Sequence, residues 1–339
     1  MKQIQTAEDI ASAAILSMML EVSAYPKPGN VHRRNDFSDT SFEHFLASAS
    51  AVQPVYLKGA AIKPNQPTSG FGPLFYEAVF RSKEAQSGGN THFGTFILLI
   101  PLVIAAGQIA AEKDESSIRK RKEGKDKKLN FEIIQKAAEI CRRTAPEDAI
   151  CFYKAFQLLT IPVQEPEKDS EDFDLDLTNP AAVDVIRQRE IPLFDIMALG
   201  AARDMVAAEW TNGFEKTEQF AQKLLKNKEW FDKNPKKRFG SSINSAVVYT
   251  FVEMLAKYPD TFIEAKQGQK KALKVQKEAA KILKISGKKN KKNSKNLKKI
   301  MPELQKFDKK LDKKKLNPGS TADIAAVGIF IALLSGLKI

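Results

Sequence analysis

Cysteine is scarce in this chain, and the scarcity limits the classes of protein to which it can belong. Cys141 and Cys151 are the only two among 339 residues, and neither lies in a CxxC spacing. A disulfide-stapled fold and a cysteine-ligated zinc ribbon are therefore excluded. Residues 1–14 contain acidic side chains and lack the basic and then apolar order of a secretory signal. Both features predict a cytoplasmic protein.

Signatures of the common nucleotide-binding and hydrolase folds are also missing. The chain has no GxxxxGK(S/T) phosphate loop, no GxGxxG turn and no GxSxG nucleophile elbow. Alternating polar and apolar residues, which are typical of strands, are rare, whereas apolar residues recur at helical spacing. We expect an all-α fold: a single compact multi-helix domain over residues 1–339, with mobile charged insertions at about 112–130 and 286–316.

Hydrophobic runs of membrane-spanning length are absent. Residues 95–111 and 324–337 are strongly apolar, but both fall short of the ~20 residues that cross a bilayer. The first run also contains Pro101 and Gln108. We interpret both runs as buried core helices and expect no membrane partner.

Basic residues outnumber acidic ones, which gives a formal net charge of +13. This charge suits anionic partners such as nucleotides, CoA-like molecules or nucleic acid. Lysine dominates residues 269–315, where aromatic residues are almost absent. Proteins that bind single-stranded DNA or RNA combine a basic groove with aromatic side chains on which the bases stack. Because such aromatics are almost absent here, we interpret the segment as a solvated lysine surface. A nucleic-acid-associated protein stays an alternative.

An apolar stripe predicts a helix over residues 7–24. Ile10, Met18 and Glu21 fall on one face at helical spacing, so Glu21 points inward. It is either a paired core carboxylate or a catalytic acid beside Lys27.

A second helix start is predicted at Thr40, which has capping-box spacing to Glu43. This helix is expected to stop near Pro54, and His44 inside it is interpreted as a core or surface histidine.

Three loops with glycine precede apolar helical segments and predict one shared polar site. They are Pro26-Lys-Pro-Gly-Asn-Val-His32, Gly88-Gly-Asn-Thr-His-Phe-Gly94 and Asn317-Pro-Gly-Ser-Thr-Ala-Asp323. Helix N-termini bind phosphate through free N–H groups and a partial positive charge. The candidate phosphate-binding residues, with two lysines as point charges, are Lys27, Gly29, Asn30, His32, Asn90, Thr91, Gly94, Lys266, Gly319, Ser320 and Thr321.

Acidic residues near these loops predict a magnesium site, because carboxylates beside a triphosphate commonly hold Mg²⁺. The candidate ligands are Asp39, Asp195, Asp204 and Asp323, and Asp36 is a further candidate catalytic acid. Asp39 and Asp323 also stand where helix caps stand, and Ser320 has capping-box spacing to Asp323. Asp195 and Asp204 reach one site only if the helix between them breaks near Gly200.

Two histidines in the loops, His32 and His92, leave a zinc site with a carboxylate as an alternative, although no HxxxH pairing exists. His92 is also the best candidate for a catalytic base, since imidazole can accept a proton near pH 7.

The loops also resemble the hallmark motifs of the triphosphoribosyl-dephospho-CoA synthase family. Pro-Lys-Pro-Gly-Asn-Val (26–31), Asn-Thr-His-x-Gly (90–94) and Pro-Gly-Ser-Thr-Ala-Asp-Ile (318–324) occur in the family's order and spacing. Asp260-Thr-Phe-Ile263 followed by Lys266-x-Gly268 resembles a fourth element. The resemblance is to the archaeal branch more than to the bacterial citrate-lyase branch.

The resemblance implies an ATP-dependent pentosyltransferase. Such an enzyme joins the triphosphoribosyl group of ATP to dephospho-CoA and releases adenine. It implies functional roles for motif residues Lys27, Gly29, Asn30, Asn90, Thr91, His92, Gly94, Gly319, Ser320 and Asp323.

The chain departs from the bacterial pattern after its first motif. Residues 33–39 replace a Gly-Ala-His-x-Asp-Met type of stretch, and the lysine-rich segment is foreign to that form. The acceptor can therefore differ from dephospho-CoA. A non-catalytic nucleotide- or CoA-binding protein and a related nucleotide-dependent transferase stay as alternatives, and a homo-oligomer is possible.

Overall fold

The computed structural model describes residues 6–64, 69–116, 126–159, 173–286 and 296–339, and within these ranges the chain is helical with no named strand. Only an isolated bridge joins His32 and Asn35. The predicted all-α fold is confirmed. The elements are α1 (Ala7–Ser23), α2 (Phe42–Ala51), α3 (Gln53–Ala60), α4 (Phe71–Glu84), α5 (Phe93–Ser116), α6 (Asp126–Arg142), α7 (Pro146–Gln157), η1 (Phe173–Leu175), α8 (Ala182–Arg189), α9 (Leu193–Gly200), α10 (Met205–Asn212), α11 (Glu215–Lys233), η2 (Pro235–Lys237), α12 (Ser242–Lys257), α13 (Thr261–Gln267), α14 (Gln269–Ser286), α15 (Leu297–Lys313) and α16 (Gly319–Leu334).

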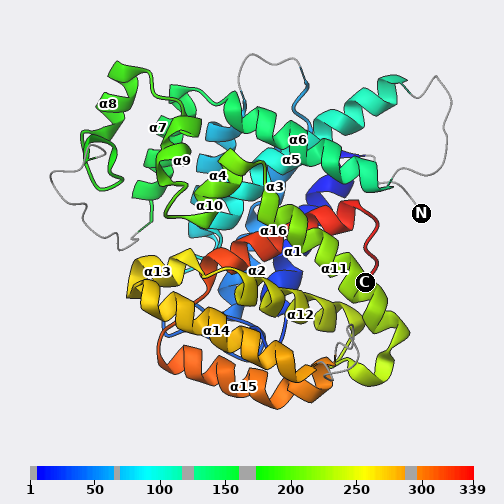
Figure 1. Cartoon of the computed structure of the whole chain (residues 1–339). Helices are drawn as coiled ribbons and strands as arrows, with labels where there is room; N and C mark the ends of the chain where they lie inside the picture. The colour runs from blue at the N-terminus through cyan, green and yellow to red at the C-terminus, as the bar shows by residue number, and fades with distance from the viewer. Residues whose placement is uncertain (1–5, 65–68, 117–125, 160–172, 287–295) are drawn as a thin grey trace.

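Helix α16 lies in the middle of the molecule, where it packs against α1, α5, α11 and α12 (Figure 1). Its sequence is apolar on every side, and most of its residues are buried. A helix of this kind has no solvent face and must be surrounded by other helices. The packing therefore places the third glycine loop, which leads into α16, deep in the fold.

Helix α5 is the second apolar core helix. It contains Pro101, which has no N–H to donate to the carbonyl of Ile97 one turn earlier. The indole Nε1–H of Trp210 on α10 donates to that carbonyl at 3.2 Å, and Trp210 is fully buried. Tertiary packing thus satisfies the carbonyl that the proline leaves free.

The expectation that the first apolar run is too short to cross a membrane is wrong, because α5 extends past both ends of residues 95–111. The segment Phe93–Glu112 is long and apolar enough, but 83% of its most apolar window is buried inside the protein. Burial of this kind confirms the interpretation of both apolar runs as core helices. The expected absence of a membrane partner stays a prediction.

The start of α2 differs from the predicted capping box. Ser41 is the N-cap, and its backbone N–H donates to Nδ1 of His44 at 3.1 Å. The predicted pair of Thr40 and Glu43 is therefore wrong by one residue. The reason is that a histidine three residues after the cap takes the place of the usual glutamate, so His44 caps the helix and is not a core residue.

The two charged segments contain more helix than expected. Helix α5 continues to Ser116 and α6 begins at Asp126, so of the segment 112–130 only residues 117–125 lie outside the described residues. The segment 286–316 contains α15, which packs on α14 at the lower edge of the molecule (Figure 1). The mobile insertion predicted there is wrong for α15. Residues 287–295 of the predicted insertion lie outside the described residues, so mobility there stays a prediction.

Candidate active site

The first glycine loop directly follows α1 and holds a buried cation. Lys27 has 2% of its side chain exposed, and its Nζ donates to Oε1 of Glu21, which lies in the last turns of α1 and is also buried. Burial lowers the pKa of Lys27 and raises that of Glu21, while the attraction between the two groups opposes both shifts. The inward orientation predicted for Glu21 is confirmed.

Gly29 allows this loop to pass close to its neighbours. Its φ is +78°, and a Cβ there would lie 2.5 Å from the carbonyl oxygen of Leu316. Only glycine combines this backbone conformation with this close approach. The first loop is thereby held against the chain that leads into the third loop, and Asn30 Nδ2 donates to Asn317 Oδ1 across the same gap at 2.6 Å.

Asp308 on α15 also holds the first loop. Its Oδ1 accepts from the Gly29 N–H at 3.0 Å, and its Oδ2 lies 2.9 Å from Nε2 of His32. The N–H of Arg34 donates to Nδ1 of the same ring at 3.2 Å, so Nε2 carries the proton that Asp308 accepts. Both ring nitrogens of His32 are occupied, and this histidine positions the loop.

The second loop begins α5 and buries His92. The Oδ1 atom of Asn90 accepts from the Phe93 N–H at 3.2 Å, as a helix cap does. His92 is 3% exposed, and its Nδ1 lies 2.8 Å from the hydroxyl of Ser48. Its Nε2 is buried and has no hydrogen-bond partner. Burial, with a smaller contribution from the positive charge of Lys27, lowers the pKa of His92 to about 3.

Asp323 on α16 is the point where the second and third loops meet. Thr95 donates its hydroxyl to Asp323 Oδ1 at 2.6 Å. A Cβ on Gly94 would lie 2.2 Å from Oδ2, so only glycine leaves room for the carboxyl. Burial raises the pKa of Asp323 to about 8, and repulsion from Glu21, Asp204 and Asp260 adds to the increase.

Asp260 ties α13 to the start of α16. Its Oδ1 accepts from the Ile263 N–H at 3.0 Å, and its Oδ2 accepts from both the N–H and the hydroxyl of Thr321 at 2.8 and 2.7 Å. Burial raises its pKa to about 6. Beside it, the hydroxyls of Thr261 and Ser320 lie 3.1 Å apart.

Asp204 completes the group of acids. It caps α10 by accepting from the Val206 N–H at 2.9 Å, and the Thr261 hydroxyl donates to it at 3.3 Å. The residue keeps contact with solvent, yet the protein atoms around its carboxyl raise its pKa. Helix α9 ends at Gly200, which is the break that the sequence required. We name Glu21, Asp204, Asp260 and Asp323 the carboxylate cluster.

Three loops that are distant in sequence thus meet around Asp323. Comparisons with known proteins identify the family. A family model described as ATP:dephospho-CoA triphosphoribosyl transferase matches residues 7–338. The chain belongs to this family. It is accordingly a pentosyltransferase, as the sequence motifs implied.

A solved structure supports the fold. The chain resembles the crystal structure of a protein from Archaeoglobus fulgidus that bears the provisional name triphosphoribosyl-dephospho-CoA synthase. The TM-score is 0.57 at 24% identity, over 86% of this chain and 100% of the other. No curated protein matches the chain.

Several residues predicted from sequence are exposed and lie outside the carboxylate cluster. Asp36 is exposed and accepts from the Phe42 N–H at 2.8 Å. Asp39 is exposed on the same loop, and its backbone carbonyl accepts from the Gly89 N–H at 3.0 Å. Asp195 is exposed in the first turn of α9.

Lys266 is exposed as well and lies over the ring of Phe262 at 4.3 Å. Because that ring is next to Gly319, Lys266 lies at the edge of the third loop. The predicted cap by Ser320 and Asp323 is wrong: the N-cap of α16 is Pro318, and Asp323 accepts from Thr95 instead.

No group of three or more His, Cys, Asp or Glu side chains in the described ranges has a geometry that could hold a metal ion by itself. The zinc alternative receives no support, since His32 has no free ring nitrogen. Mg²⁺ makes a different demand, because it is usually bound by one or two carboxylates together with substrate phosphates and water. Asp323, whose burial and repulsion from neighbouring acids raise its pKa, is the candidate carboxyl for that role.

Two residues of the site were missed from sequence. Asp308 stands among lysines, but it shares a helical stripe with Leu304, Phe307 and Leu311, and this spacing was a usable signal. Ser48 carries no signal at all, since a serine inside a helix is common and its partner His92 is 44 residues away.

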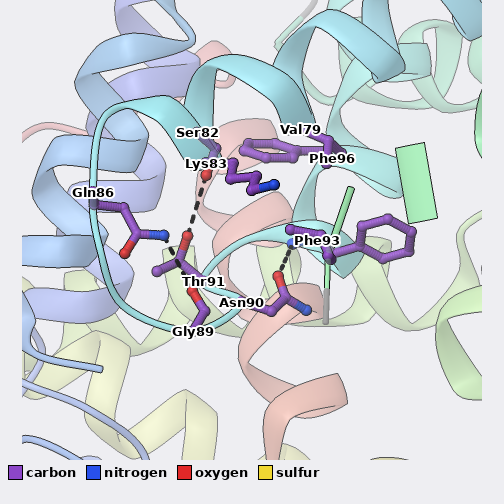
Figure 2. A pocket seen from close by; sticks show the side chains of 10 residues that line it. Val79, Ser82, Lys83, Gln86, Gly89, Asn90, Thr91, Phe93 and Phe96 are labelled. Carbon is purple, nitrogen blue, oxygen red and sulfur yellow. Dashed lines mark hydrogen bonds between the residues drawn. The ribbon is translucent and has the colours of Figure 1, made fainter. Parts of the chain in front are cut away.

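Figure 2 shows a small cavity beside the second loop, lined by Ser82, Gln86, Thr91 and Phe96 among others. Its volume of ≈ 10 Å³ is room for about one water molecule. A nucleotide does not fit there, so this cavity is a side opening and not the substrate site.

Proposed function

We propose that this protein transfers the triphosphoribosyl group of ATP to a dephospho-CoA-like acceptor and releases adenine. One observation carries the proposal: Lys27, Gly94 and Asp323, each from a different family motif, converge on one buried site. A merely structural arrangement would not need an ion pair and several acids of raised pKa at one point in the core. Perturbed groups of this kind are enriched at catalytic sites.

The reaction breaks the bond between adenine and ribose and forms a bond from an acceptor hydroxyl to the same carbon. An oxocarbenium-like centre develops on that carbon, and negative carboxylates stabilise such a charge. The carboxylate cluster supplies acids at one place. We propose Asp323 as the acid nearest the reacting ribose. Its pKa of about 8 belongs to the unliganded protein, and a positive charge that develops on the ribose favours its ionised form.

The acceptor hydroxyl must lose its proton, and we propose His92 as the base. Its unpartnered Nε2 is available, and the ring is neutral at pH 7 because its pKa is about 3. A pKa this low makes a weak base in the free protein. A bound triphosphate beside Lys27 adds negative charge, which raises the pKa of His92 toward a useful value.

The triphosphate is proposed to lie along the loops at the N-termini of α5 and α16, with Lys27 as a positive charge. Polar groups of Asn30, Thr91, Ser320 and Thr321 are near these ends. Mg²⁺, held by Asp323 and Asp204 or Asp260 together with the phosphates, would neutralise charge on the triphosphate.

The experiment is an adenine-release assay. Purified protein is incubated with ATP, Mg²⁺ and dephospho-CoA, and adenine and the coupled product are separated by chromatography. CoA in place of dephospho-CoA tests the acceptor, and Asp323→Asn is the inactive control. Nucleotide binding without release of adenine in the presence of any acceptor would favour the non-catalytic alternative.

A cytoplasmic location and an archaeal type of sequence are proposed on the sequence features alone.

A further inference from the structure

Three hydroxyl groups connect the buried histidine to the side opening of Figure 2. From His92 Nδ1 the chain runs to Ser48 at 2.8 Å, then from Ser48 to Ser82 at 2.7 Å, and then from Ser82 to Thr91 at 3.4 Å. Ser48 and Ser82 are buried, whereas Thr91 is half-buried. Ser82 and Thr91 line the small cavity, as Figure 2 shows.

The hydrogen-bond partners of the two ring nitrogens favour one tautomer of His92. Neutral imidazole has one N–H and one bare nitrogen. Nε2 is buried without a partner, so a proton on it would be a buried donor with no acceptor. With the proton on Nδ1 instead, the ring donates to Ser48, Ser48 donates to Ser82, Ser82 donates to Thr91, and Nε2 presents its lone pair.

Within the described part of the chain, His92 has no hydrogen bond to a carboxylate that would take its proton. Phe45 and Phe96 flank the ring, with centroids at 4.9 and 5.9 Å. The charge that acts on it is that of Lys27, which disfavours a second proton. A proton that arrives on Nε2 must therefore be matched by one that leaves from Nδ1.

We propose that Ser48, Ser82 and Thr91 form a proton relay from His92 to the cavity beside the second loop. When Nε2 accepts the proton of the acceptor hydroxyl, the Nδ1–H bond breaks. Each of the three hydroxyls then accepts one proton and passes one on, and a water in the cavity takes the last. The cavity has the volume for that water. After product release, Nε2 gives its proton to water that enters the emptied site, and the proton in the cavity returns through the three hydroxyls to Nδ1, which restores the starting tautomer.

This inference rests on the proposed role of His92 as the base, so its test has one readout that needs no turnover. Nitrogen-15 NMR of the imidazoles in the unliganded protein distinguishes the two tautomers. We expect His92 as the Nδ1–H tautomer in the wild type. In Ser48→Ala we expect that preference to be lost. A wild-type Nε2–H tautomer would overturn the relay, whether or not the enzyme releases adenine.

Kinetics supply the second readout. Ser48→Ala and Ser82→Ala should each slow adenine release on the order of tenfold, less than removal of the base itself. In mixtures of light and heavy water, the wild-type rate should fall along a curve, as for several protons in transit, and the variants should show a straight line. Ser50→Ala, an exposed serine on the same helix, is the matched control and should behave as the wild type.

The outcomes separate the two hypotheses. If Ser48→Ala and Ser50→Ala have the same rate and the same isotope response, the relay is wrong while the transferase function stands. If no adenine appears with the wild type, the proposed function is wrong, and the tautomer result alone decides the state of His92. Thermal unfolding of each variant shows that a lost rate is not a lost fold.

Discussion

Lys27 and Glu21 form an ion pair that is almost wholly removed from water, with side-chain exposures of 2% and 4%. Glu21 lies in the last turn of α1 and Lys27 lies in the first family motif, so the pair joins the helix to the site. The charge of Lys27 also interacts with Asp323 and with His92.

Glu21→Gln should destabilise the protein strongly, because it leaves Lys27 as a buried charge without a counter-ion. The expected loss is about 3–5 kcal/mol, measured by chemical denaturation. The double variant Glu21→Leu with Lys27→Met should recover most of that stability, since apolar residues often replace a buried pair without cost. It should remain inactive. An active double variant would show that the pair is only structural.

His92→Asn should lower turnover on the order of a hundredfold, the lower end of general-base effects. Asparagine can keep a hydrogen bond to Ser48 but has no atom in place of Nε2, so thermal stability should change little. His44→Asn is the matched control, because it removes the same atom from a histidine that caps α2. Full activity of both variants, measured as adenine release, would remove His92 from the mechanism.

Asp323→Asn should abolish adenine release and change how stability depends on pH. The pKa of Asp323 is about 8 in the folded protein against a usual 3.8, so the folded chain holds a proton that the unfolded chain loses. This contribution is fully present below about pH 4 and is lost as the pH rises through about 8. The variant, which cannot ionise, should therefore gain stability relative to wild type as the pH rises. Thermal unfolding across that window measures the difference, with Asp195→Asn as a surface control. A constant difference across the window would contradict the raised pKa.

Gly94→Ala should inactivate the enzyme through a steric effect on one carboxyl. The added methyl would lie 2.2 Å from Asp323 Oδ2, which must move. Gly200→Ala is the control, since its nearest contact is an ordinary 3.4 Å to Ala207. The readout is adenine release together with helical content by circular dichroism. Normal activity of Gly94→Ala would argue that the position of Asp323 does not matter for the chemistry.

Removal of Mg²⁺ should weaken ATP binding, because the triphosphate would meet several acids without a bridging cation. Calorimetric titration with ATP in Mg²⁺ and in EDTA measures the effect. In Asp323→Asn the dependence on Mg²⁺ should shrink. Equal affinity in both buffers for the wild type would exclude the bridging role.

The sequence predicted those helices and loops whose signals depend on the spacing of nearby residues. The helix that carries Glu21, the apolar helices behind the second and third loops, and the convergence of the three loops were all accessible, because apolar periodicity and glycine motifs are local signals. The role of Asp323 as a buried acid was hidden by its cap-like spacing from Ser320. Its real partner, Thr95, lies 228 residues away.

The lysine-rich segment was misjudged because charge count outweighed periodicity. Leu304, Phe307, Asp308 and Leu311 form a buried stripe under the exposed lysines of α15. Asp308 on that stripe fixes both Gly29 and His32. The lysine content of α15 reflects only its exposed face and gives no information about the buried face that supports the site.

The packing of α1 on α16 has a consequence for how the enzyme forms. Residues 7–23 and 319–334 are neighbours in space, so the chain must close a loop of about three hundred residues before Lys27 and Asp323 can influence each other. Closure of so long a loop costs entropy that only the completed core repays, and contacts of this separation slow folding. A nascent chain that lacks α16 would leave the Lys27–Glu21 pair without its covering helix. Catalytic competence is therefore acquired in the same late step as global folding.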